Sequence, residues 1–192
     1  MNSQKDNRFL HGYISDIIDI LNKRKDYLSE ILKLKELIIK IKKKNKKIIF
    51  AGNGGSAATA SHASVDFTKN AKIKSINFNE ADLITCFSND YGYERWVEKA
   101  IEFYADKGDA LILISASGES NNMLNAINSA KKVGVKTIIT FTGNNKNNSL
   151  SKLGDINFWI DSKSYNHIEN VHQILLLSLV DLIIGKKDYP PN

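Results

Sequence analysis

The stretch Ile48–Ser56, IIFAGNGGS, decides the fold of this chain. Its first four residues are apolar and have the length and composition of a buried strand. Three glycines and a serine follow within five residues, and the next segment, 57–67, has helical character. Glycines between a strand and a helix let the backbone approach a ligand, and the free N–H groups of the helix start attract anions. An ordinary tight turn with an N-cap explains the stretch equally well, and its spacing is not that of a dinucleotide-binding fingerprint.

The same alternation of apolar strand and helix continues along the chain. We expect further strands at 83–87, 110–114, 136–141 and 156–160, and helices at 95–105, 121–133 and 168–184. This alternation predicts an α/β fold, a doubly wound parallel sheet flanked by helices. Ligands of such folds bind at the carboxyl ends of the strands, which directs attention to the loops there.

The segment before the first strand is predicted to be helical. Apolar residues recur at helical spacing over 10–43, and no proline interrupts them. We therefore expect one or two amphipathic helices that pack on the domain or on a partner subunit. The chain is divided into an N-terminal helical segment 1–46, a main domain 47–187 and a tail 188–192.

Composition narrows the class of protein. The chain has 192 residues, of which 42% are hydrophobic and 25% charged, with a formal net charge of +6, as in a single soluble domain. Its one cysteine, Cys86, excludes an intramolecular disulfide and favours a reducing cytoplasm. The lysine run 40–47 is interpreted as a solvated helix end, because no nucleic-acid motif accompanies it. We expect a cytoplasmic protein that binds neither nucleic acid nor membranes.

A second loop carries a stronger signal for phosphate. Residues 115–120, SASGES, follow an apolar strand and precede a helix. Capping explains one of the three serines but hardly all three. Hydroxyls at alternate positions of a tight loop converge on one phosphate while backbone N–H groups fill its remaining acceptors.

Together these motifs resemble a known family. GNGGSA at 52–57, His62 on the next helix, SNDYGYE at 88–94 and SASGES at 115–120 resemble the sugar isomerase (SIS) domain. Within it the chain is most similar to the phosphoheptose isomerases, and the resemblance covers nearly the whole chain. It implies a flavodoxin-like fold and a homotetrameric cytoplasmic enzyme. The reaction implied is the isomerisation of sedoheptulose 7-phosphate to a heptose 7-phosphate for cell-surface polysaccharides such as lipopolysaccharide or capsule.

The resemblance also implies which residues hold the substrate. Most would bind the phosphate, and two, from the SNDYGYE segment, would lie near the sugar hydroxyls. The set is Asn53, Gly54, Ser56, Asn89, Asp90, Ser115, Ala116, Ser117 and Ser120.

The catalytic positions depart from the family pattern. By the resemblance, His62 matches the family's first histidine, while Asp66 stands for a glutamate and Glu169 for a glutamine. Leu177 stands where the family has a catalytic histidine, and leucine neither binds metal nor carries a proton. The family often places zinc among these four positions. Asn70 and Asn166 stand where an arginine and an aspartate are typical.

His172 is the candidate replacement for the missing histidine. It lies three residues after Glu169 on the expected last helix, and Asp66 lies four residues after His62, so each pair shares a helix face. We expect His62, Asp66, Glu169 and His172 to act either as a zinc site or as a metal-free acid–base set. His172 also fits a purely structural histidine, since it points away from the direction of Leu177.

Three functions remain open at this point. The first is a phosphosugar aldose–ketose isomerase. The second, motivated by Leu177, is a non-catalytic SIS module that binds a sugar phosphate or a protein. The third is altered chemistry on another sugar. Elsewhere, Cys86 is expected to be a small core residue and the polar stretch 143–149 a flexible surface turn.

Overall fold

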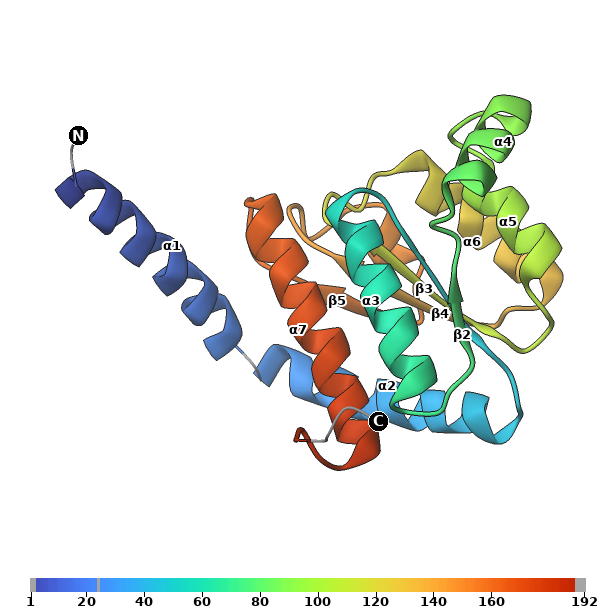
Figure 1. Cartoon of the computed structure of the whole chain (residues 1–192), viewed down its shortest axis with the longest axis horizontal. Coiled ribbons are helices and arrows are strands. Elements are labelled where there is room, and N and C mark those ends of the chain that lie inside the picture. The colour runs from blue at the N-terminus through green and yellow to red at the C-terminus, as the bar shows by residue number, and fades with distance from the viewer. Residues whose placement is uncertain (1–2, 24, 189–192) are drawn as a thin grey trace.

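Five parallel strands form one sheet in the order β2-β1-β3-β4-β5. The computed structural model describes residues 3–23 and 25–188, and Figure 1 shows the whole chain. The strands are β1 (Ile48–Gly52), β2 (Ser75–Asn77), β3 (Ala110–Ser115), β4 (Thr137–Thr142) and β5 (Ile156–Trp159). The doubly wound parallel sheet predicted from the sequence is confirmed.

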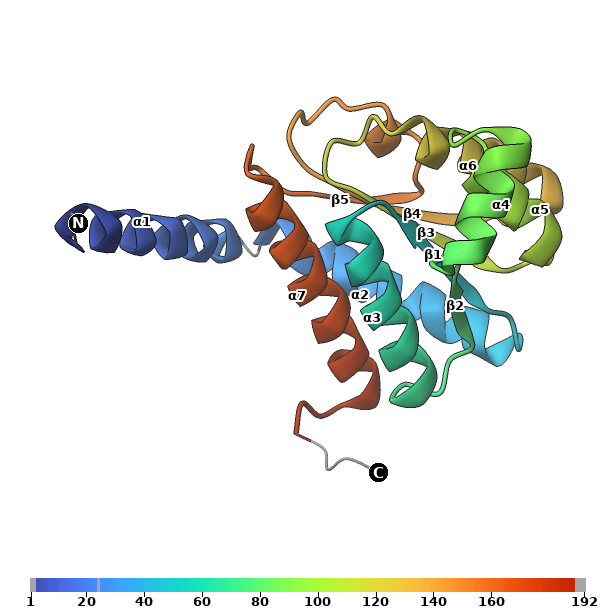
Figure 2. The same cartoon turned by 45° about the horizontal axis from the view of Figure 1, so that its top comes forward.

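Helices cover both faces of the sheet (Figures 1 and 2). One face carries α2 (Lys25–Lys43), α3 (Gly55–Lys69) and α7 (Tyr165–Ile184); the other carries α4 (Ala81–Tyr91), α5 (Trp96–Tyr104) and α6 (Asn121–Val133). Successive strand residues point to opposite faces. Phe50 and Ile112 accordingly join the core under α3 and α7, while Ile49 and Leu111 join the core under α5 and α6.

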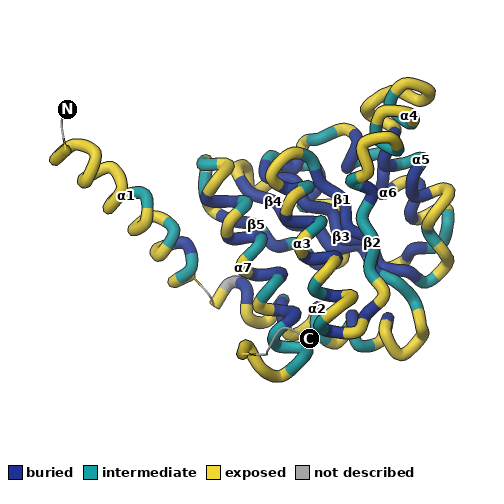
Figure 3. The backbone as a smooth tube through the Cα atoms, in the orientation of Figure 1, coloured by how far each residue is buried: buried dark blue, intermediate teal, exposed yellow. Residues whose placement is uncertain are grey.

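The two N-terminal helices behave differently. Helix α2 packs into the core, where Leu34 and Ile38 are almost completely buried. Helix α1 (Ser3–Asn22) instead projects from the body and is exposed over most of its length (Figures 1 and 3). The expected helical segment is therefore present. Helix α2 belongs to the domain core, whereas α1 joins the core only at its C-terminal end, through Ile20 and Leu21.

One predicted strand is wrong. Residues 83–87 lie within α4, and the missing strand is the short β2, which pairs with β1. A short apolar run fits a strand and a helix equally well in sequence, and the β2 residues SIN carry no apolar pattern. As a consequence Cys86 is exposed on α4 and not in the core.

Helix α7 is the one helix of residues 3–23 and 25–188 that is long and apolar enough to cross a membrane. It lies against the sheet face next to α3 (Figure 1), and Val171, Leu176 and Leu179 are buried there. Its apolar composition thus corresponds to its place in the core.

Candidate phosphosugar site

The site lies where the order of the sheet reverses. From β1 the chain proceeds to β2 on one side, whereas β3 lies on the other side of β1. The loops after β1 and β3 therefore open a crevice at the carboxyl ends of the two strands. Helices α3 and α6 begin there. Ser56 N–H and Met123 N–H in their first turns already donate to Asn53 O and Ser120 O, both at 3.0 Å, so it is the N–H groups before them that remain for a ligand.

The β1–α3 loop is tight because two glycines make room for it. Gly54 has a φ of 55°, a conformation that favours glycine. A Cβ on Gly52 would lie 2.8 Å from the backbone carbonyl group of Ser56, so only glycine lets α3 start directly against β1.

Seven predicted residues come together in one cavity of about 100 Å³. They are Asn53, Ser56, Ser115, Ala116, Ser117, Ser120 and Glu169, and Ile114 and Tyr165 complete the lining. The volume equals roughly three water molecules, which suits a phosphoryl group but not a whole sugar. A sugar phosphate bound here would extend its carbon chain out of the cavity.

The serine loop has hydroxyl protons to spare. Gly118 N–H donates to Ser115 Oγ, and Glu119 N–H donates to Ser117 Oγ, both at 3.2 Å. A hydroxyl that accepts from an amide keeps its own proton for an acceptor. Ser120 is the N-cap residue of α6 yet its side chain makes no capping hydrogen bond; its Oγ lies 3.3 Å from Ser115 Oγ. The loop therefore presents hydroxyl donors to the cavity.

The polar stretch 143–149 braces the serine loop. Asn148 is fully buried, and a Cβ on Gly118 would overlap its side-chain amide. Leu150 N–H donates to Gly118 O at 2.9 Å, and Ser149 N–H donates to the Glu119 carboxylate at 2.9 Å. The prediction of a flexible surface turn is thus wrong for its end, because a polar composition does not reveal that Asn148 is buried.

A pair of amides joins the two loops. Asn53 and Asn122 exchange side-chain hydrogen bonds of 3.0 and 2.9 Å, and Tyr93 Oη donates to Asn53 Oδ1 at 3.2 Å. Asn122 lies in the first turn of α6 and is buried. Neither partner of Asn53 was predicted as a site residue, since only the fold brings them near it.

The N-terminus of helix α7 is the third helix N-terminus that lies at the cavity. Ser164 caps α7 by accepting from the His167 N–H at 3.4 Å, and Tyr165 and Glu169 lie in the first turns. The carboxyl group of Glu169 covers Gly55, where a Cβ would overlap it. Three helix N-termini, each with partial positive charge, thus surround the cavity and favour an anion there.

His62 and Asp66 lie farther along α3, beside α7. Their side chains approach to 3.6 Å between His62 Nε2 and Asp66 Oδ2. On its other side, His62 Nδ1 is 3.2 Å from Gln173 Nε2. Gln173 stands one helical turn after Glu169 and one before Leu177, a spacing that signals a shared face, yet it was not predicted.

His172 does not join this group. It lies on the side of α7 that faces the sheet and is fully buried there. Its Nε2 is 3.0 Å from Thr142 O, and its ring packs edge-on against Phe141. Burial lowers its pKa to about 4, against a smaller opposing effect of the hydrogen bond. The expectation that His172 shares the face of Glu169 is corrected, because i, i+3 residues differ enough in direction for one to face the sheet.

Two further predicted residues lie outside the cavity. Asn89 and Asp90 are exposed on α4, and Asn89 Nδ2 donates to Asp90 Oδ1 at 2.9 Å. Of the SNDYGYE segment, it is Tyr93 that reaches the loops. Within the described part of the chain, no three His, Cys, Asp or Glu side chains gather as they would around a metal ion.

Comparison with known proteins places this geometry in a family. The family model for the SIS domain matches residues 12–143. The phosphoheptose isomerase of Aliarcobacter butzleri is 33% identical over 157 residues, 79% of this chain and 82% of that protein. That of Helicobacter pylori is 32% identical over 172 residues, 86% of this chain and 88% of that protein. The solved phosphoheptose isomerase GmhA from Neisseria gonorrhoeae shares the fold with a TM-score of 0.86 at 23% identity, over 93% of this chain and 98% of that one. The chain belongs to the SIS domain family and, within it, to the phosphoheptose isomerases.

Proposed function

We propose that this protein converts sedoheptulose 7-phosphate to a heptose 7-phosphate. The observation that supports it most is the cavity of serine hydroxyls and helix N-termini, which has Glu169 at its edge. The relatives named above favour an isomerase over the non-catalytic module that Leu177 suggested.

The substrate has a defined direction in this proposal. Ser115, Ser117 and Ser120 hold the phosphate on C7, and the reacting carbons C1 and C2 are at the other end of the chain. From Ser56 to His62 is six residues, which along a helix is about 9 Å. An extended heptose phosphate therefore directs C1 and C2 along α3, on the side where His62 meets Gln173 of α7, toward His62 and Asp66.

We assign the proton transfers of the reaction to His62 and Asp66. In ketose–aldose isomerisation a base removes a proton from C1 to give an enediol and returns it to C2, while a second group moves a proton between the two oxygens. Asp66 has the carboxylate for the first task, and the His62 imidazole both donates and accepts protons. Gln173 positions the imidazole ring, and Glu169 accepts from sugar hydroxyls or shares the role of base.

The residues of this chain do not complete the zinc site that the family resemblance implies. A closed zinc site takes four ligands and a catalytic site three with an open position. His172 is held against Thr142 and Leu177 has no donor atom, so His62, Asp66 and Glu169 do not complete the family's set of four. The proposed reaction has no step through a metal, and zinc content stays a prediction that elemental analysis of the purified protein tests.

Turnover is tested directly. The pure protein is incubated with sedoheptulose 7-phosphate in D₂O, with zinc or with a chelator, and the aldose product and deuterium at C2 are followed by NMR. Asp66→Asn and His62→Asn should remove turnover about 10²–10⁴-fold, while Gln173→Leu should lower kcat and shift the pH profile. If the protein binds ketose phosphates but turns none of them over under any condition, the isomerase hypothesis is refuted and the non-catalytic binding module is supported.

A homo-oligomer, a tetramer by the family resemblance, forms part of the proposal. Projecting helix α1 exposes Phe9, Leu10, Ile14 and Ile18, of which the last three recur every four residues. An apolar stripe on an isolated helix is the surface that a second copy would cover. Cytoplasmic location, and the absence of nucleic-acid and membrane partners, remain predictions; light scattering and cell fractionation test these points.

A further inference from the structure

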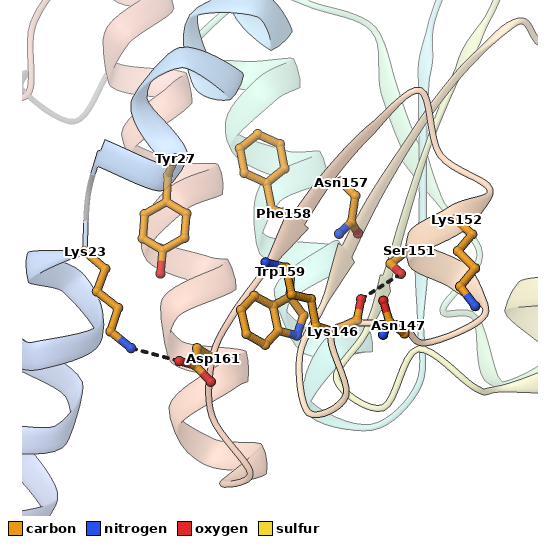
Figure 4. Close-up of a pocket in the computed structure, with 10 residues that line it drawn as sticks. All are labelled: Lys23, Tyr27, Lys146, Asn147, Ser151, Lys152, Asn157, Phe158, Trp159 and Asp161. Atoms are coloured by element: carbon orange, nitrogen blue, oxygen red, sulfur yellow. Dashed lines mark hydrogen bonds and ion pairs between the residues drawn. The ribbon is translucent and has the colours of Figure 1, made fainter.

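A second cavity, much larger than the serine cavity, lies beside the edge strand β5. Its volume is about 800 Å³, and it lies between β5, the segment 146–152 and the start of α2 (Figure 4). The family assignment and the proposed reaction make no use of it. Cavities of this size are in the range that binds whole small molecules.

The wall of this cavity offers an oriented donor. Thr140 and Thr142, both fully buried, donate their hydroxyl protons to Asn157 Oδ1 at 2.8 and 3.1 Å. These two bonds fix the side-chain amide, and its NH₂ group has no acceptor among the residues that the structure describes. Asn157 is half-buried and lines the cavity (Figure 4), so its N–H bonds are available to donate to a ligand there in place of water.

The charge of the lining is positive. Three lysines, Lys23, Lys146 and Lys152, face a single carboxylate, Asp161, and that carboxylate is bound by Lys23 at 2.9 Å. Within the described ranges Lys146 and Lys152 form no ion pair. Lys146 lies over the Trp159 ring, and Lys152 adds to the Ser149 hydrogen bond that lowers the pKa of Glu119, but no carboxylate of the described residues binds either ammonium group directly. Both can therefore bind an anion, and charge-assisted hydrogen bonds to phosphate are among the stronger ones.

An aromatic ring completes the set. Lys146 Nζ lies 5.4 Å from the centre of the Trp159 ring, and the buried Trp159 Nε1 has no hydrogen-bond partner in the part of the chain described. An indole face beside ammonium groups suits a ligand with one planar ring and one anionic end.

We propose that this cavity binds a nucleoside diphosphate. The base takes the place of the Lys146 ammonium group over the Trp159 indole, and Lys146 then holds the diphosphate together with Lys152. The Asn157 amide donates to the ribose or the phosphate. A sugar monophosphate would leave most of the 800 Å³ empty, whereas base, ribose and diphosphate together use the ring, the donors and the charge.

ADP is the probe for this site. Titration of the full-length protein with ADP should quench the fluorescence of Trp159, and calorimetry should report binding with the same affinity. Trp159→Phe should remove the fluorescence change. Lys146→Glu and Lys152→Glu should each weaken ADP binding at least about tenfold. The matched control Lys131→Glu, on the exposed side of α6, should leave the affinity unchanged.

Other outcomes overturn the proposal. Absence of both heat and quenching at millimolar ADP would do so, as would binding that tolerates both charge reversals. Ser120→Ala distinguishes the two cavities: loss of ADP binding in this variant would place the nucleotide in the serine cavity. Pyrophosphate that binds as tightly as ADP would refute a role for the base. None of these results depends on whether sedoheptulose 7-phosphate is turned over, so this proposal and the proposed function fail separately.

Discussion

The burial of His172 predicts a loss of stability in acid. Its imidazole is neutral in the folded protein because burial lowers its pKa from 6.5 to about 4. In the unfolded chain the same group takes up a proton as the pH falls below 6.5. Between pH 6.5 and 4 the unfolded state binds more protons, so the free energy of unfolding falls as the pH falls. For one such group the loss from pH 7 to pH 5 is about 2 kcal/mol.

The substitution His172→Leu isolates this effect. Thr142 O still accepts the Ile160 N–H at 2.8 Å, so removing the imidazole leaves no carbonyl unpaired. The variant also removes Nδ1, which is buried without a partner among the residues described. Urea unfolding of both proteins at pH 7, 6 and 5, at one protein concentration, gives the difference between their free energies of unfolding. We expect this difference to move in favour of the leucine variant by about 2 kcal/mol at pH 5.

A control and a second readout make this prediction decisive. Val171→Ala, a buried neighbour that does not titrate, should change stability by the same amount at every pH. Because His172 faces the sheet, the leucine variant should also keep most of its turnover at pH 7. A pH-independent difference between wild type and His172→Leu would refute the burial argument, and loss of turnover in a folded variant would return His172 to the catalytic set.

Three further predictions follow from the loops and from α1. Ser120→Ala should raise KM for a ketose phosphate about tenfold without lowering the Tm, because Ser120 makes no capping bond; a lower Tm would show that it does cap α6. Gly118→Ala should cost about 2 kcal/mol or more in urea unfolding, because φ is 68° and a Cβ overlaps Asn148; an unchanged midpoint would contradict this geometry. Ile14→Lys should reduce the mass measured by light scattering if α1 holds the oligomer together, whereas Lys5→Glu, on the same helix, should not.

Much of the fold could be predicted from local sequence. The buried strands β1, β3 and β4 and the long helices α6 and α7 were expected within a few residues of their bounds, since continuous apolar runs and helical periodicity are local signals. Strand β2 and helix α4 were missed, since a three-residue strand with a single apolar residue, Ile76, and one short apolar run carry no such signal. Residues 75–77 form a strand because they pair with β1, and residues 81–91 form a helix that packs near α5.

The sequence by itself determined the glycine loop after β1 and the serine loop after β3. Glycines and serines at a strand–helix junction act through their own backbone and hydroxyls, so the sequence predicted that Ser115, Ser117 and Ser120 lie together, and the structure has them line one cavity. Their binding of phosphate stays a prediction. Contacts between distant segments are different, because they depend on which side chains the sheet order brings together. Only the tertiary structure decided that Asn148 braces Gly118, that Gln173 reaches His62, and that His172 is buried against Thr142.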